Sequence, residues 1–237
     1  MTYLRLSFYL LLTLISVYSM TAAAQHAGRW YQVELLIFKR NTPPTDTIPA
    51  SQREEWPTDI SLAYPEEYRF IEDPLPSSEH QLGGYSYALT RNEQFEVLFH
   101  QAWDQQMWEE SRSTPFIIRA GQRNDDHWEL EGSINIHIGR FLHLTTDLWL
   151  SEFIYGDVSS SFSENAWPIL PILGSDNTAL IDTPGNNFIA PFLADKPQVS
   201  RAVKFTERRS MRSKETHYMD HPEMGIIVRM LPIEPKN

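Results

Sequence analysis

The 237-residue sequence contains no cysteine, which excludes disulfide bonds and any zinc site closed by thiolates. A hydrophobic core must therefore supply the stability. Basic residues are also in the minority, since 20 lysines and arginines face 31 aspartates and glutamates and the formal net charge is −11. This balance argues against a general affinity for nucleic acid or for anionic lipid.

The sequence also lacks common catalytic motifs. It has no G-x-S-x-G nucleophile elbow and no H-E-x-x-H metal helix, and Ser210 sits among arginines without an acid-base motif beside it. A pair of carboxylates for glycoside cleavage stays open, because such residues need not be close in sequence, but no pair stands out. The residues by themselves therefore single out no catalytic site, and we expect no cofactor.

The N-terminus has the pattern of a secretory signal peptide. Arg5 precedes an apolar run over residues 6–17, and three alanines offer a cleavage site before Gln25. The run is short for a membrane span, with an uncleaved anchor as the alternative. We expect a signal peptide over residues 1–24 and a single periplasmic domain over residues 25–237, without stable membrane insertion after cleavage.

Alternation of apolar and polar residues predicts several strands. Residues 29–40 are apolar on one face and, in the second half, on the other face as well, which is typical of a strand inside a sheet. Residues 114–121, 127–139 and 140–150 also have strand patterns, and Gly139-Arg140 can turn the chain between the last two. The positions expected in the core are Leu130, Ile134, Ile136, Ile138, Leu142, Leu144, Leu148 and Leu150.

One helix is predicted after residue 90. Thr90 and Glu93 fit a capping box, and an apolar stripe follows at helical spacing: Phe95, Leu98, Phe99, Ala102 and Trp103. Residues 41–88 and 151–200 show no such period and are expected to be two long irregular excursions. The predicted fold is α+β, an antiparallel β-sheet with one main amphipathic helix on a face.

The C-terminal segment returns to the strand pattern. Residues 202–212 alternate, with Val203, Phe205 and Met211 on the expected inner face. Residues 214–219 and 226–233 are predicted as strands joined by a turn over residues 220–225, in which Pro222 fixes φ and Gly225 permits a positive φ.

The polar stretch from Arg208 to Gly225 is the strongest candidate for a functional site. Its possible metal ligands match no known spacing, and the nearby arginines would repel a cation, so we expect no metal there: His217, Asp220, His221 and Glu223. Arg208 and Arg212 are four residues apart on a strand and share one face, whereas Arg209 points to the other. Guanidinium groups bind carboxylates in a bidentate fork.

Aromatic side chains can complement these arginines, because their rings stack on the faces of sugars. His143 and Trp149 are expected on the outward face of another strand of the same sheet. The predicted ligand-binding residues are Arg208, Arg212, His143, Trp149 and Tyr218. The alternative is that the arginines only pair with surface acids.

Four segments resemble, in the same order, the CsiV-type family of bacterial periplasmic peptidoglycan-binding proteins. They are WYQVELLIFKR, LTRNEQFEVLFHQAW, GSINIHIGRFLHLTTDLWL and RRSMRSKETHYMDHPEMGIIVRMLP. The resemblance implies binding to peptidoglycan and support of its synthesis through a bifunctional penicillin-binding protein and its lipoprotein activator. It implies no catalysis and assigns no binding residue. A protein-interaction adaptor without glycan contact and an unrecognised cell-wall hydrolase remain the alternatives.

Overall fold

The computed structural model describes residues 28–41, 64–154, 173 and 198–234, which form eight strands and one α-helix. The predicted α+β class, antiparallel strands with a single helix, is therefore confirmed. The expected signal peptide, residues 42–63 of the first predicted excursion and the larger part of the second lie outside the described residues. Within them, no helix is long and apolar enough to cross a membrane.

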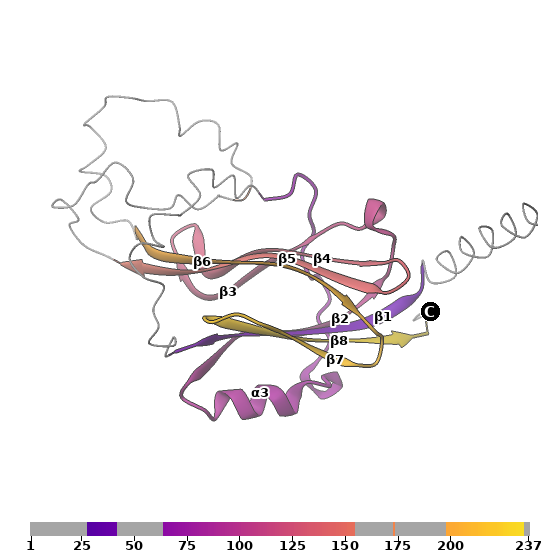
Figure 1. Ribbon diagram of the computed structural model, residues 1–237, viewed down its shortest axis with the longest axis horizontal. Coiled ribbons are helices and arrows are strands. Elements are labelled where there is room, and N and C mark those ends of the chain that lie inside the picture. The colour runs from indigo at the N-terminus through magenta and orange to yellow at the C-terminus, as the bar shows by residue number, and fades with distance from the viewer. Residues whose placement is uncertain (1–27, 42–63, 155–172, 174–197, 235–237) are drawn as a thin grey trace, which may run out of the picture.

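The strands divide between two antiparallel sheets, with the orders β2-β1-β8-β7 and β3-β4-β5-β6. The first sheet consists of β1 (Trp30–Arg40), β2 (Phe95–Gln106), β7 (Thr216–Asp220) and β8 (Met224–Ile233). The second consists of β3 (Phe116–Asn124), β4 (His127–Ile138), β5 (Leu142–Ile154) and β6 (Gln198–Met211). The sheets stack as two layers, and the helix α3 (Gly83–Thr90) lies on the far side of the first (Figure 1).

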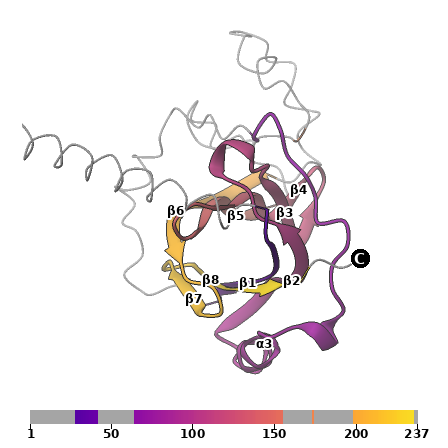
Figure 2. The same cartoon turned by 90° about the vertical axis from the view of Figure 1, so that its right-hand side faces the viewer.

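The main core fills the space between the two layers. The inward positions predicted for β4 and β5 are all buried, and so are Val203, Phe205 and Met211 of β6. From the first sheet, Val33, Leu35 and Ile37 of β1 join the same cluster. Figure 2 shows the two sheets enclosing this interior, which is consistent with a protein that has no disulfide bond.

The strand β1 is buried on both faces, as its sequence predicts, and it lies between β2 and β8 inside the sheet. On its outer face, Leu36 and Phe38 pack with Leu82 and Ile227 in a second, smaller cluster. The helix α3 covers this side of the sheet, so the first sheet is sandwiched between the main core and the helix (Figure 1).

The prediction of a helix after residue 90 is wrong, because residues 95–106 form the strand β2. Phe99 and Trp103 point into the main core opposite Ile37 and Val33, whereas Ala102 lies on the other face opposite Glu34. A bulge at the level of Ile37 and Phe38 shifts the alternation near Leu98. A bulged strand that is buried on both faces thus reproduces the spacing of a helical stripe.

The one α-helix of the described residues, α3, instead falls at the end of the predicted first excursion. The 3-10 turns η1 (Ser77–Glu79) and η2 (Glu110–Arg112) are the other helical pieces of the described chain. The second predicted excursion begins too early, since β5 continues to Ile154, and it ends too late, since β6 starts at Gln198.

The turn near Asp220 is confirmed as the connection of the hairpin β7–β8. The strand with the arginines, β6, belongs to the other sheet, so the arginine face and the hairpin turn are not parts of one hairpin. Gly225 is not among the glycines with positive φ. Glycine is needed there because the ring of Phe38 occupies the space that a Cβ atom would take.

Candidate functional site

The outer face of the second sheet carries a cluster of polar and charged side chains around two of the predicted binding residues, Arg208 and His143. Strand register places His137 beside His143, His143 beside Ser210, and Thr145 beside Arg208. Glu110, from η2, reaches over this face to Arg208. We call Glu110, His137, His143, Arg208 and Ser210 the outer-face cluster.

The centre of the outer-face cluster is a bidentate pair between Arg208 and Glu110. The two guanidinium nitrogens Nη1 and Nη2 donate to the carboxylate oxygens Oε1 and Oε2, each at 2.9 Å. Both side chains are more than half exposed, at 52% and 57%. Hydrogen bonding from Arg208 is the main reason why the pKa of Glu110 lies below its ordinary value.

The two histidines of the cluster stack on each other, with ring centroids 4.9 Å apart and an angle of 14° between the rings. Burial is the main cause that lowers the pKa of both His137 and His143, and the charge of Arg208 lowers both further. Arg208 Nη2 also donates to His137 Nε2 at 3.3 Å. His137 is therefore neutral with its proton on Nδ1 when Arg208 makes this bond.

Ser210 completes the cluster from the strand next to His143. Its hydroxyl lies 3.1 Å from His143 Nδ1. A serine beside an imidazole is the first half of a nucleophilic arrangement, but a triad also requires a third group that orients the imidazole. The bonds of Arg208 to Glu110 and His137 hold a guanidinium fork at the surface, and such a fork can bind a carboxylate.

Trp149 is not the exposed platform that strand alternation predicts. It does lie on the outer face of the second sheet, but it is only 2% exposed. The ring of Tyr64 packs against it at a centroid distance of 5.6 Å, and its indole nitrogen donates to the buried carboxylate of Glu131 at 3.2 Å. Tyr64 therefore covers Trp149, and the indole bonds within the protein, so Trp149 has a structural role.

Arg212 and Tyr218 lie away from the strand pairing that assembles the cluster. Arg212 follows the end of β6, and its largely exposed guanidinium approaches Glu215 at 3.9 Å. Tyr218 belongs to β7 of the other sheet and stacks on Phe38 with ring centroids 6.3 Å apart. Of the five predicted residues, the structure therefore brings only Arg208 and His143 together.

Tyr218 instead forms a polar group with Arg40 and Asp220. Arg40 Nη2 donates to the Tyr218 hydroxyl at 3.0 Å and to Asp220 Oδ1 at 2.7 Å. Burial, reinforced by hydrogen bonding to Asp220, raises the pKa of Tyr218 to about 12. This group fastens β1 to the hairpin β7–β8.

Four side chains near the hairpin turn are possible metal ligands by type, and no metal is expected there: His217, Asp220, His221 and Glu223. His217 Nε2 contacts the backbone of Arg212, and His221 Nδ1 accepts a bond from the backbone of Glu223. Among the residues that the structure describes, one group of three metal-ligand side chains converges, and it lies elsewhere: Glu34, His80 and His100. The sequence signal for it is a single acid inside the apolar run of β1.

The fold and the outer-face cluster define an α+β protein of two sheets that presents an exposed, carboxylate-binding arginine. The chain belongs to the CsiV family, described as peptidoglycan-binding protein, because the family model matches residues 7–75 and 72–233. Neither a curated protein nor a solved structure matches the chain. The resemblance found in the four sequence segments is thereby confirmed.

Proposed function

We propose that this chain is a non-catalytic periplasmic protein that binds peptidoglycan through the outer face of its second sheet. The family description supports peptidoglycan as the ligand. The observation that carries the proposal is the bidentate bond between Arg208 and the carboxylate of Glu110, which supports a role of this fork in binding a ligand carboxylate. Stem peptides of peptidoglycan supply carboxylates of this kind.

Glu110 occupies the place of the ligand carboxylate in this proposal. An exposed ion pair contributes little to stability, because solvent screens it. Exchange of one carboxylate for another at Arg208 therefore requires little free energy, and additional contacts of the glycopeptide can favour the ligand. Thr145 and Thr206 lie on the same face and offer hydroxyl groups for such contacts.

Binding to purified sacculi tests the site. Arg208→Ala should weaken binding about tenfold, which corresponds to about 1.4 kcal/mol, and Arg208→Lys should restore only part because an ammonium lacks the planar fork. Arg209→Ala is the matched control, since Arg209 is equally exposed, at 51%, on the same strand. Wild-type binding by a folded Arg208→Ala variant would show that the arginine only pairs with surface acids.

We further propose that binding supports cell-wall synthesis and cell shape by assisting a bifunctional penicillin-binding protein and its lipoprotein activator. Synthase activity on lipid-linked precursor, measured with the activator and with or without this chain, tests the assistance. Stimulation without sacculus binding would favour a pure adaptor. Release of muropeptides from sacculi by the chain alone would favour a hydrolase, with the contact between Ser210 and His143 as the place to look.

A further inference from the structure

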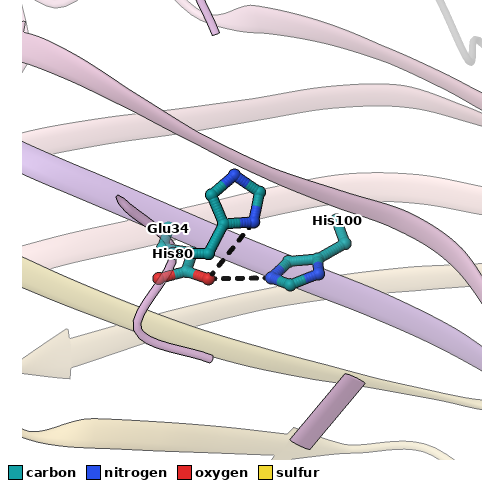
Figure 3. Close-up of side chains that lie close together, drawn as sticks. All are labelled: Glu34, His80 and His100. Carbon is teal, nitrogen blue, oxygen red and sulfur yellow. Dashed lines mark hydrogen bonds and ion pairs between the residues drawn. The ribbon is translucent and has the colours of Figure 1, made fainter. Parts of the chain in front are cut away.

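A second group of polar side chains lies on the outer side of the first sheet. Glu34 projects from β1 opposite Ala102 of the neighbouring β2, and His100 lies two residues before Ala102, on the same face of the sheet. His80 reaches them from the segment between η1 and α3. Figure 3 shows both imidazoles directed at the same carboxylate oxygen, Glu34 Oε1, with His100 Nε2 at 2.8 Å and His80 Nδ1 at 3.8 Å.

The carboxylate at the centre of this group is buried and fixed. Glu34 is 1% exposed. Leu82 N donates to Oε1 at 2.9 Å, and Gln81 N donates to Oε2, so the backbone at the start of α3 is bound to the carboxylate. Although burial raises the pKa of Glu34, the bonds from His100 and from these two amides outweigh it and lower the pKa. The group is therefore an ionised carboxylate held in one orientation.

His80 is oriented by a backbone carbonyl on its other side. Its Nε2 lies 3.2 Å from the carbonyl oxygen of Leu75, which only accepts, so Nε2 carries a proton. In a neutral ring, Nδ1 then has a free lone pair that faces Glu34 Oε1. These two atoms, 3.8 Å apart, are both acceptors and cannot hydrogen-bond to each other, whereas a cation between them would bind both.

We propose that Glu34, His80 and His100 form a binding site for a divalent transition metal, with zinc as the best fit. Two imidazoles and one carboxylate are an established donor set for zinc, with a fourth position left for water. All the ligand atoms lie within 4.8 Å of one another. Zinc bonds of about 2.0–2.2 Å place tetrahedral ligands about 3.3–3.5 Å apart. This spacing lies between the separations of His100 Nε2 and His80 Nδ1 from Oε1, 2.8 Å and 3.8 Å.

Small adjustments complete the site. His100 Nε2 must offer its lone pair, so its proton moves to Nδ1 when the metal binds. The carbonyl of Leu75 has the role of the outer hydrogen-bond partner that usually fixes a metal-binding histidine. A bound ion would join β1, β2 and the chain that starts α3, and would thereby stabilise the cover of the first sheet. This inference goes beyond the proposed function and does not depend on it.

Zinc titration of the purified chain, after treatment with a chelator, tests the site. We expect one zinc ion per chain by calorimetry, and a thermal midpoint about 5–10 °C higher at a zinc concentration one hundred times the dissociation constant. His80→Ala should weaken zinc binding at least tenfold, while it keeps the bond between Glu34 and His100 that supports the fold. The double variant His137→Ala, His143→Ala is the control for zinc bound by other histidines and should bind as the wild type does.

Three results would overturn the proposal. The first is a wild-type chain that binds no zinc. The second is a folded His80→Ala variant that binds zinc with wild-type affinity. The third applies if the His80→Ala variant does not fold, in which case the wild type is studied with cobalt in place of zinc. Absence of the visible absorption of tetrahedral cobalt would then overturn the proposal.

Discussion

The outer faces of the two sheets carry similar chemistry in opposite settings. Each brings a carboxylate and two histidines together, Glu110 on the second sheet and Glu34 on the first. The Glu110 side chain is 57% exposed and bound by a single arginine, whereas the Glu34 side chain is 2% exposed and bound by two backbone amides and His100. An exposed carboxylate can be exchanged for that of a ligand. A buried one fixes the fold and can hold a metal.

The interior that the two faces share sets the scale for their effects on stability. Trp103 is 3% exposed and packs against Phe116 with ring centroids 5.3 Å apart. Trp103→Ala should lower the free energy of unfolding by about 3–5 kcal/mol, because it leaves a large cavity. Urea unfolding measures the change, and a loss below about 1 kcal/mol would contradict the packing of β2 against the second sheet.

Removal of the buried carboxylate should have the next largest effect. Glu34→Ala leaves the amides of Gln81 and Leu82 without their acceptor, and the Leu82 amide is buried, so we expect a cost of roughly 2–4 kcal/mol. The measurement is made with a chelator present, so that metal binding does not contribute. Glu110→Ala, the exposed counterpart, should change stability little. If both variants lost similar stability, the contrast between the two faces would fail.

The strands with regular alternation could be predicted from the sequence. In β4, β5 and β6 each inward position repeats every second residue, and the shared face of Arg208 and His143 follows from the same parity. In β2 the bulge near Leu98 and burial on both faces hide the alternation, so helical spacing is a false signal there.

The candidate sites could be predicted only where one strand or one pair of strands determines them. Glu110 meets Arg208 across 98 positions of sequence, and His80 meets Glu34 only because a separate segment lies over the first sheet. Strand alternation likewise predicts on which face of the sheet Trp149 lies, but it does not predict that Tyr64 packs over Trp149. Such contacts depend on the order of strands and on the path of connections, which local patterns do not contain.

If a ligand carboxylate replaces that of Glu110 at Arg208, removal of the Glu110 charge should strengthen ligand binding. Glu110→Gln removes the negative charge that competes for Arg208 and keeps the size of the side chain. We expect binding to sacculi to become several times tighter, without a change in the urea midpoint. Glu215→Gln, beside Arg212, is the control for a general loss of negative charge and should bind as the wild type does. Weaker binding by Glu110→Gln would mean that Glu110 positions the arginine for the ligand and does not compete with it.

The smallest expected effect is the pH dependence of the histidines in the outer-face cluster. His137 faces Glu110 from η2, His143 from β5 and Arg208 from β6, and burial is the main cause that lowers its pKa below the ordinary value of 6.5. The unfolded chain therefore binds a proton more readily than the folded one. The stability is complete above pH 6.5 and declines as the pH falls through the lower folded-state pKa.

Urea unfolding at pH 7.5 and at pH 5.5 measures this decline. His137→Gln removes one of the two titrating groups, so the variant should lose less stability than the wild type between the two conditions. The control is Arg209→Ala, on the same sheet, because this substitution removes no group that titrates in this range. The variant should show the same loss of stability between the two pH values as the wild type. Because the pKa of Glu110 lies below 4.5, its own contribution is lost only in more acidic solution and does not disturb the comparison. An equal or steeper decline in His137→Gln would show that protonation is favoured in the folded cluster, and the orientation of Arg208 toward a neutral His137 would then be wrong.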